Sequence, residues 1–415
     1  MKHKIYSSIT IILATLLLLT ACATPATPTQ APPPTSAPVA ANPTAVPPTE
    51  APKPTAVPPT EAPKATAVPP TEAPTVAPTA AGPCLIVGAL YGGPMNDAGY
   101  NQAMHESMTQ MNKKITCVKL IEAENVPDEA GAKTTMENMI QQGAKLIFAT
   151  AFNHQNPAFE LAKTHKDVIF EHAGGWMMGD NFANYFGAPP NSWYAMGVAA
   201  GLTTKSNKLG FVAAFPLGWT TTFINAFTLG AQSVNPKVQT NVAYTFNWGD
   251  RAKEADATNS LINQGADVIT MHVDSPSTII STAESRGVNS IGFQNLAAQQ
   301  FAPENWITGS GYTLGDKITW LTSTVLDKTW KPIFLRCGVK DGCMAIAPFG
   351  PNVPKDVQDK VLQAIKDADE GKLVVFKGPI VDQTGAVKIA AGETLTDDKM
   401  SALDWFVKGV VGSPK

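Results

Sequence analysis

The 415-residue sequence has little charge, because only 16% of its residues are Asp, Glu, Lys or Arg and their sum at pH 7 is −3. A chain without a basic field is a poor candidate for nucleic-acid binding, since phosphates attract clusters of Lys and Arg. Long apolar runs are also absent after Leu19, where no segment approaches the roughly 20 residues that a spanning helix needs. The composition therefore argues against a nucleic-acid-binding protein and against a polytopic membrane protein.

Sequence signatures of catalysis are missing as well. No G-x-x-x-x-G-K-[ST] string occurs, and Gly309, Gly311 and Gly315 have the wrong spacing for a dinucleotide fingerprint. No G-x-S-x-G nucleophile elbow occurs either. The six histidines form no H-x-H or H-x-x-x-H pair that would favour a metal site. We therefore expect a protein that is not an enzyme and that uses no metal or cofactor.

Proline and aromatic residues are unevenly distributed along the chain. Residues 23–83 hold 19 of the 34 prolines and none of the 32 aromatic residues. An eleven-residue unit, Pro-Thr-Ala-Val-Pro-Pro-Thr-Glu-Ala-Pro-Lys, begins at Pro43 and recurs from Pro54. Prolines at this density exclude a helix, and no side chain here is large enough for a core. The stretch is expected to be a disordered, extended spacer; a polyproline ligand for a partner domain is the alternative, and glycosylation of its threonines stays open.

The N-terminus predicts export and lipidation. Lys2 and Lys4 precede an apolar segment at 9–19, which is too short for a stable membrane span. The tetrapeptide that ends at Cys22, Leu-Thr-Ala-Cys, resembles a bacterial lipobox. We expect residues 1–21 to be a lipoprotein signal peptide, Cys22 to carry the lipid, and 22–83 to tether a globular part to the outer face of the cell membrane. The alternative is an ordinary secretory signal with a chance cysteine.

The remaining residues, 84–415, alternate short apolar runs with longer amphipathic stretches. Strands are predicted at 84–90, 116–120, 146–150, 168–170, 208–213, 238–244, 268–271 and 290–293. Helices are predicted at 101–111, 129–142, 191–203, 220–233, 253–264 and 276–286, and glycine directly follows three of them. Strands that alternate with helices of this length indicate βαβ units and parallel sheets.

Two stretches of this part are similar to each other. Residues 140–148 and 262–270 both read as the end of a helix, then Gln-Gly-Ala, then an apolar strand. This weak duplication predicts two similar α/β lobes whose strand ends face each other across a cleft, where parallel sheets bind ligands. We expect lobe 1 to comprise 84–204 with 311–330, and lobe 2 to comprise 205–310 with 331–415. The helix at 191–203 is rich in small residues, which permit close packing.

Four cysteines remain besides Cys22, and they allow three pairings. Cys337 and Cys343 flank a short turn that a disulfide could close. Cys84 and Cys117 lie in the first two predicted strands, which should be neighbours. The favoured pairing is therefore 84 with 117 and 337 with 343, with free buried thiols as the alternative.

Several segments, taken in this order, resemble the basic-membrane-protein family of ABC-transporter solute-binding lipoproteins, the group that includes purine-nucleoside receptors. The segments are 93–102, 170–174, 184–187, 195–201, 225–231 and 253–256. The resemblance spans 84–415 and implies a type I periplasmic-binding fold, with two Rossmann-like lobes joined by a three-strand hinge. It also implies a purine nucleobase or nucleoside as ligand, an ABC permease with its ATPase as partners, and membrane contact through the lipid anchor only. We expect a monomer.

The family pattern Asn-Asp-x-x-aromatic-Asn falls on Asn96, Asp97, Tyr100 and Asn101. In relatives the aromatic residue stacks on a purine and its polar neighbours bond the edge of the ring.

Further candidates follow the predicted strands of both lobes. A second ring could come from Phe215, Trp219, Phe246 or Trp248, with core or hinge packing as the alternative for each. The carboxylates that could meet purine N–H groups are those of Glu171, Asp250 and Asp274, with helix capping as the alternative. Phe152 and Gln294 complete the set of expected ligand-binding residues.

One departure from the family pattern bears on the ligand. Nucleoside-type relatives place an Asp after the strand that matches 291–293 and a Lys near 310–312, and both groups are associated with the ribose. This chain has Gln294 and Asn295 at the first place and no Lys at the second. The sequence therefore favours a free nucleobase such as adenine; a nucleoside-binding importer component and a sensor lipoprotein that acts on a membrane receptor are the alternatives.

Overall fold

The computed structural model of the protein describes residues 82–187 and 190–415. The predicted signal peptide, the lipidation site Cys22 and the tether up to residue 81 lie outside the described residues. Within the described ranges, no helix is both long and apolar enough to span a membrane.

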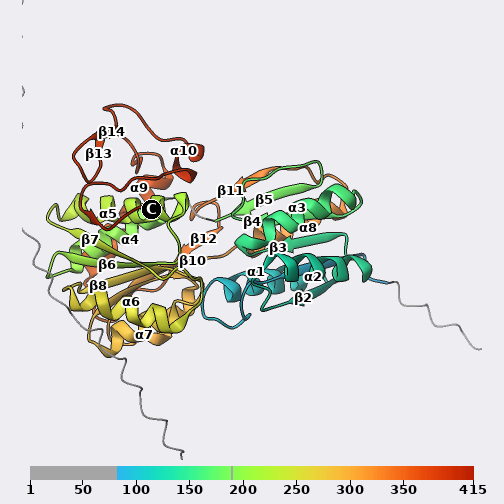
Figure 1. Ribbon diagram of the computed structural model, residues 1–415, viewed down its shortest axis with the longest axis horizontal. Helices are drawn as coiled ribbons and strands as arrows, with labels where there is room; N and C mark the ends of the chain where they lie inside the picture. The colour runs from blue at the N-terminus through green and yellow to red at the C-terminus, as the bar shows by residue number, and fades with distance from the viewer. Residues whose placement is uncertain (1–81, 188–189) are drawn as a thin grey trace, which may run out of the picture. The chain divides into compact units, whose positions relative to one another are not determined.

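The first lobe is built on a six-stranded, wholly parallel sheet with the order β11-β5-β4-β3-β1-β2. Its strands are β1 (Leu85–Leu90), β2 (Val118–Ala123), β3 (Leu146–Ala149), β4 (Ile169–Ala173), β5 (Phe182–Phe186) and β11 (Phe334–Arg336). Its helices are α1 (Tyr100–Lys114), α2 (Glu129–Gln141), α3 (Gln155–Thr164) and α8 (Gly315–Leu326), together with the short 3-10 helix η1 (Phe152–His154). Figure 1 shows these elements gathered in one lobe.

The second lobe is built on a seven-stranded sheet with the order β12-β10-β9-β8-β6-β7-β15, in which only β12 runs antiparallel to its neighbour. Its strands are β6 (Lys208–Ala213), β7 (Gln239–Tyr244), β8 (Val268–His272), β9 (Asn289–Gln294), β10 (Trp306–Tyr312), β12 (Met344–Ile346) and β15 (Val410–Val411). Its other elements are α4 (Pro190–Thr203), α5 (Gly218–Val234), α6 (Arg251–Asn263), α7 (Ser277–Ser285), η2 (Leu296–Phe301), α9 (Lys355–Asp369), the hairpin of β13 (Ile380–Val381) and β14 (Val387–Ile389), and α10 (Asp397–Ser401).

The two sheets repeat one strand order, since β2-β1-β3-β4-β5 corresponds to β7-β6-β8-β9-β10. This confirms the predicted pair of similar, mainly parallel α/β lobes. The glycines of the two similar stretches serve the same local purpose: Gly143 follows α2 with φ +93° and Gly265 follows α6 with φ +94°. Glycine adopts this left-handed conformation without the steric cost of a Cβ, so the chain can leave each helix at this point and turn into the strand that follows.

The chain passes between the two sheets three times: after β5, after β10, and between β11 and β12. The elements divide between the lobes differently from the boundaries expected at 204 and 330. Helix α4 packs against α5 and α9 of the second lobe, and β11 pairs with β5 of the first. Close helix packing explains the first difference, because a Cβ on Gly197 would lie 1.9 Å from the Phe227 carbonyl oxygen.

Both favoured cysteine pairs form disulfides. Cys84 bonds to Cys117, with 5.4 Å between their Cα atoms, and this bond joins the residue before β1 to the residue before β2. Cys337 bonds to Cys343 across the third passage between the sheets, with 5.6 Å between the Cα atoms.

One carboxyl group lies in the apolar core of the first lobe. Glu171 on β4 accepts a hydrogen bond at Oε1 from the indole Nε1 of Trp330, at 2.7 Å. Its Oε2 is buried and has no protein partner in the described part of the chain. Burial raises the pKa of Glu171 from 4.5 to about 8, because the charged form loses its hydration; the Trp330 bond offsets part of this rise.

The buried acid makes a prediction about stability and pH. Ionisation of Glu171 is unfavourable only in the folded state, where its pKa is about 8 instead of 4.5. The effect of this side chain on the unfolding free energy therefore becomes steadily less favourable as pH rises from 4.5 to about 8, and it does not change further above that range. Glu171→Gln keeps the acceptor for Trp330 and cannot ionise. It should exceed the wild type in unfolding free energy by a few kcal/mol above about pH 8 and match it near pH 4. Urea unfolding at a series of pH values measures the difference, with surface Glu160→Gln as control; a difference that does not vary with pH would contradict the assignment.

Candidate ligand-binding site

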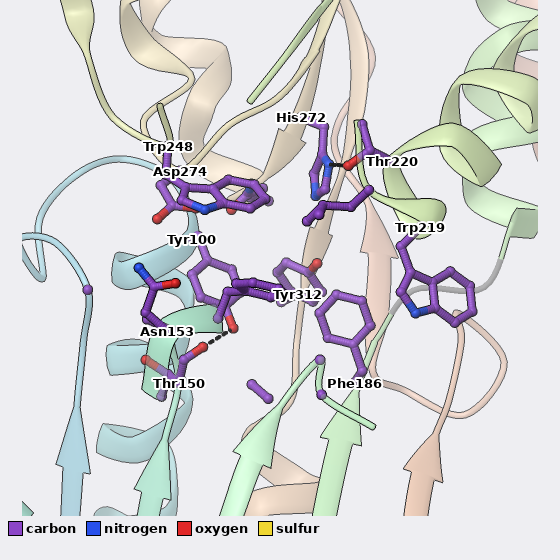
Figure 2. A pocket seen from close by; sticks show the side chains of 18 of the residues that line it. Tyr100, Thr150, Asn153, Phe186, Trp219, Thr220, Trp248, His272, Asp274 and Tyr312 are labelled. Atoms are coloured by element: carbon purple, nitrogen blue, oxygen red, sulfur yellow. Dashed lines mark hydrogen bonds between the residues drawn. The ribbon is translucent and has the colours of Figure 1, made fainter. Parts of the chain in front are cut away.

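A cavity of about 390 Å³ lies where the carboxyl ends of the two parallel sheets face each other (Figure 2). This is the edge at which open α/β sheets bind ligands, because the loops that leave the strands converge there. The first lobe contributes Gly92, Tyr100, Pro127, Thr150, Ala151, Phe152, Asn153, Ala173, Gly174, Gly175, Trp176, Phe186 and Arg336. The second lobe contributes Leu217, Gly218, Trp219, Thr220, Trp248, His272, Asp274, Gln294, Tyr312 and Ser401.

Aromatic rings form much of the wall. The Tyr100 and Tyr312 rings meet edge to face with 5.7 Å between centroids, and Phe186 packs against Tyr312 at 5.9 Å. Figure 2 shows Tyr100, Phe186, Trp219 and Trp248 arranged around the same space. Rings from both lobes therefore offer faces and edges to a flat ligand.

The two lobes are in direct contact beside the cavity. The backbone N–H of Tyr100, the first residue of α1, donates to the carbonyl oxygen of Asp274, which follows β8, at 2.9 Å. The Tyr100 hydroxyl donates to the carbonyl of Thr150 at 2.7 Å, which fixes the ring. The Tyr100–Asp274 bond therefore joins the two lobes, while the Tyr100–Thr150 bond lies within the first lobe.

The polar side chains on the cavity wall include those of Asp274 and Gln294. Burial raises the pKa of the Asp274 carboxyl well above its usual range, the nearby Asp97 and Glu254 carboxylates raise it further, and a hydrogen bond with the Asn101 side chain opposes the rise. Gln294 donates through Nε2 to the Val273 carbonyl, while its buried Oε1 has no protein partner in the described ranges. Its backbone has φ +84°, which is unusual for a residue other than glycine. An acceptor left unpaired beside a cavity suits a ligand N–H.

His272 is neutral at physiological pH, since burial lowers its pKa to about 3. Its Nδ1 lies 3.1 Å from the Thr220 hydroxyl, and its ring meets the edge of Trp248 at 5.6 Å. The group therefore supports the wall instead of supplying a positive charge. In the described part of the chain no three His, Cys, Asp or Glu residues are arranged to hold a metal ion.

Six of the expected ligand-binding residues lie on the cavity wall. They are Tyr100, Phe152, Trp219, Trp248, Asp274 and Gln294. Of the other two candidates for a second ring, Phe215 packs on Trp248 at 5.5 Å and Phe246 is largely exposed; neither lines the cavity.

The other five expected residues lie off the wall. The Asp97 carboxylate accepts the backbone N–H groups of Gly99, Asn101 and Gln102 at 2.8 to 3.1 Å, and the Asn101 amide at 2.7 Å. These bonds satisfy the free N–H groups at the start of α1 and thereby position Tyr100.

Asp250 caps α6 in the same way, accepting from the Ala252 and Lys253 backbone at 3.1 and 3.2 Å. Asp250 therefore acts as a helix cap, which is the alternative given for it above, and not as a wall residue of the cavity. Asn96 is exposed, and Glu171 lies in the core described above.

Sequence reasoning missed Phe186, Tyr312, Asn153 and Arg336, which also line the cavity. Phe186, Tyr312 and Arg336 end strands β5, β10 and β11, none of which was predicted. Had those strands been recognised, the position at a carboxyl end would have marked all three residues.

The geometry agrees with comparisons to known proteins. A family model described as "ABC transporter substrate-binding protein PnrA-like" matches residues 85–380. A purine-binding protein of Brucella abortus is 35% identical over 330 residues, which cover 79% of this chain and 93% of that protein. A putative ABC transporter glucose-binding protein of Haloferax volcanii is 31% identical over 288 residues, covering 68% and 71%.

Solved structures show the same fold. A solute-binding protein of an ABC transporter system from Conexibacter woesei superposes with a TM-score of 0.58 at 19% identity, covering 70% of this chain and 97% of that one. Together with the match over 85–380, this confirms the periplasmic-binding fold expected from the sequence. The chain belongs to the PnrA-like family of ABC transporter substrate-binding proteins.

Proposed function

We propose that this substrate-binding protein captures a purine-type ligand, with a free nucleobase such as adenine favoured, by closing its two lobes. The observation that carries the proposal is the cavity itself, in which Tyr100, Phe186, Trp219 and Trp248 surround a space bordered by the acceptors of Gln294 and Asp274. Aromatic faces hold a flat ring, and a few acceptors fix its N–H edge. The similarity to a protein named for purine binding supports the same ligand class.

The preference for a base over a nucleoside rests on residues at the carboxyl ends of β9 and β10. Gln294 stands on the wall, while Asn295 uses its side chain to cap η2, accepting the Ala297 N–H at 2.8 Å. No lysine occurs at 310–312. The side chains associated with the ribose in nucleoside-type relatives therefore have no counterpart here.

A sugar is the second candidate, because one relative is named for glucose binding. Aromatic rings also stack on sugars, but a flat heterocycle uses ring faces on both of its sides, and the rings of Tyr100, Phe186, Trp219 and Trp248 come from both lobes. The cavity suits a flat heterocycle better.

Closure gives the mechanism of capture. A ligand that touches both lobes binds the closed form more tightly than the open form. It can shift the equilibrium between the open and closed forms only by the difference between those two binding free energies. Opening breaks the Tyr100–Asp274 hydrogen bond, so the ligand and this bond favour the same state.

In this proposal the lipid on Cys22 anchors the protein to the outer face of the cell membrane, and the tether lets a monomeric binding body reach an ABC permease driven by its ATPase. A sensor that reports its ligand to a membrane receptor is the alternative. Adjacent genes for an ATPase and permeases favour import; an adjacent receptor-kinase gene favours sensing.

Calorimetric titration with adenine, guanine, adenosine, guanosine and glucose tests the ligand class. A base should bind at least about tenfold more tightly than its nucleoside, because ribose hydroxyls without partners in a closed cavity cost free energy. Preference for a nucleoside would contradict the choice of a free base, and preference for glucose would contradict the purine class.

Substitution of a wall residue tests the location of the site. Trp248→Ala should weaken adenine binding by about 1–3 kcal/mol, the usual contribution of a base stacked on an aromatic ring. Trp320→Ala is the matched control, since Trp320 lies on α8, is 47% exposed and does not line the cavity. Equal adenine affinities for the two variants would show that the ligand binds elsewhere.

A further inference from the structure

Arg336 is the only Lys or Arg among the residues that line the described cavity. It ends β11 in the first lobe, directly before the disulfide-closed passage at 337–343. A second cavity of about 190 Å³ adjoins the first, and the two share Phe186, Trp219 and Arg336 as wall residues. The Arg336 side chain thus lies at the partition between two spaces.

The contacts of Arg336 reach the second lobe. Its guanidinium lies 4.8 Å from the centroid of the Trp219 ring on α5 and 4.2 Å from that of Phe334 on its own strand. Its Nη1 is 3.5 Å from Oδ2 of Asp397, at the start of α10. Because β11 belongs to the first sheet while α5 and α10 belong to the second lobe, two of these three contacts join the lobes.

The partner Asp397 belongs to a segment that is fastened to the second lobe. The Thr222 hydroxyl donates to the Met400 carbonyl at 2.6 Å. Asn225 donates to the Trp405 carbonyl and accepts the Val407 N–H, both at 2.9 Å. We call residues 397–407 the C-terminal strap.

The strap also takes part in the cavity, since Ser401 lines it. A Cβ on Gly218 would lie 2.0 Å from the Ser401 carbonyl oxygen, so strap and helix start are in close contact. The family model ends at residue 380, before the strap begins. This wall of the cleft is therefore built by sequence that the matched family region does not include.

We propose that Arg336 is a positioning residue that clamps the lobes in the closed form, through its contacts with Trp219 and with Asp397 of the C-terminal strap. A half-exposed ion pair contributes little by itself, but a guanidinium stacked over an indole adds to it. Opening of the lobes separates both contacts at once. The clamp goes beyond the proposed function, because it does not depend on which ligand the cavity takes.

The test uses a reporter of closure that needs no ligand. The Tyr100 amide donates across the lobes, so its hydrogen exchange follows opening. In the ligand-free full chain, Arg336→Ala and Asp397→Asn should exchange this amide faster than the wild type, by about three- to thirtyfold for Arg336→Ala. Arg336→Lys, which keeps the charge and loses the planar stacking surface, should fall between wild type and Arg336→Ala.

The matched control is Lys163→Ala. Lys163 also combines an ion pair, with Glu160 at 2.6 Å, and a contact over a ring, that of Phe159 at 4.8 Å, but all three residues lie within α3. It should leave exchange at Tyr100 unchanged. If the Arg336 and Asp397 variants behave like this control, the clamp is wrong.

A second measurement separates the clamp from direct ligand contact. The dissociation rate of adenine should rise in Arg336→Ala by a factor similar to that seen in exchange. Faster dissociation with unchanged exchange would make Arg336 a ligand contact and overturn the clamp. Faster exchange in a protein that does not bind adenine would support the clamp while removing the proposed ligand.

Discussion

The structure depends on how the first turn of α1 is held. The N–H groups at the start of a helix have no partners within it. Here Asp97 takes three of them, and the remaining donor, that of Tyr100, points to the Asp274 carbonyl in the other lobe. One helix start therefore fixes the Tyr100 ring in the cleft and joins the lobes. Asp97, which caps the helix, and Tyr100, which lines the cavity, thus lie only three residues apart in the sequence.

The electrostatics of the cleft follow from burial. His272 is held neutral, and the Asp274 carboxyl is shifted toward its neutral form, so the aromatic wall carries little formal charge. Arg336 is the exception, and its charge is directed to Asp397 and to the Trp219 face. Such a site favours a neutral, flat ligand with N–H groups over an ion, which is consistent with the proposed nucleobase.

Apolar runs were enough to predict β1, β3, β4, β6, β8 and β9, which are largely buried on both faces, and they also marked the more exposed strands β2 and β7. They failed for β10, where Gly309, Ser310 and Gly311 interrupt the run, and for β11, which has only three residues. The wall residues Tyr312 and Arg336 were lost with those strands. Asp97 was expected at the ligand from the family pattern and Asp250 from its place after a strand, but both cap helices; a short acidic side chain can do either, and sequence alone does not separate the two roles.

The lobe boundaries illustrate the same limit. Helix α4 packs through Gly197 onto α5, the next helix in the chain. The lobe to which α4 belongs nevertheless depends on three-dimensional packing, which has no local sequence pattern. The pairing of β11 with β5 joins segments about 150 residues apart and has no local signature.

The central claim is that the closed cleft holds a purine ring. Mass spectrometry of the small molecule released by denaturing the purified, undialysed protein tests it most directly. The account predicts the mass of a purine base. Release of a sugar, or of any other compound without a purine ring, would contradict it.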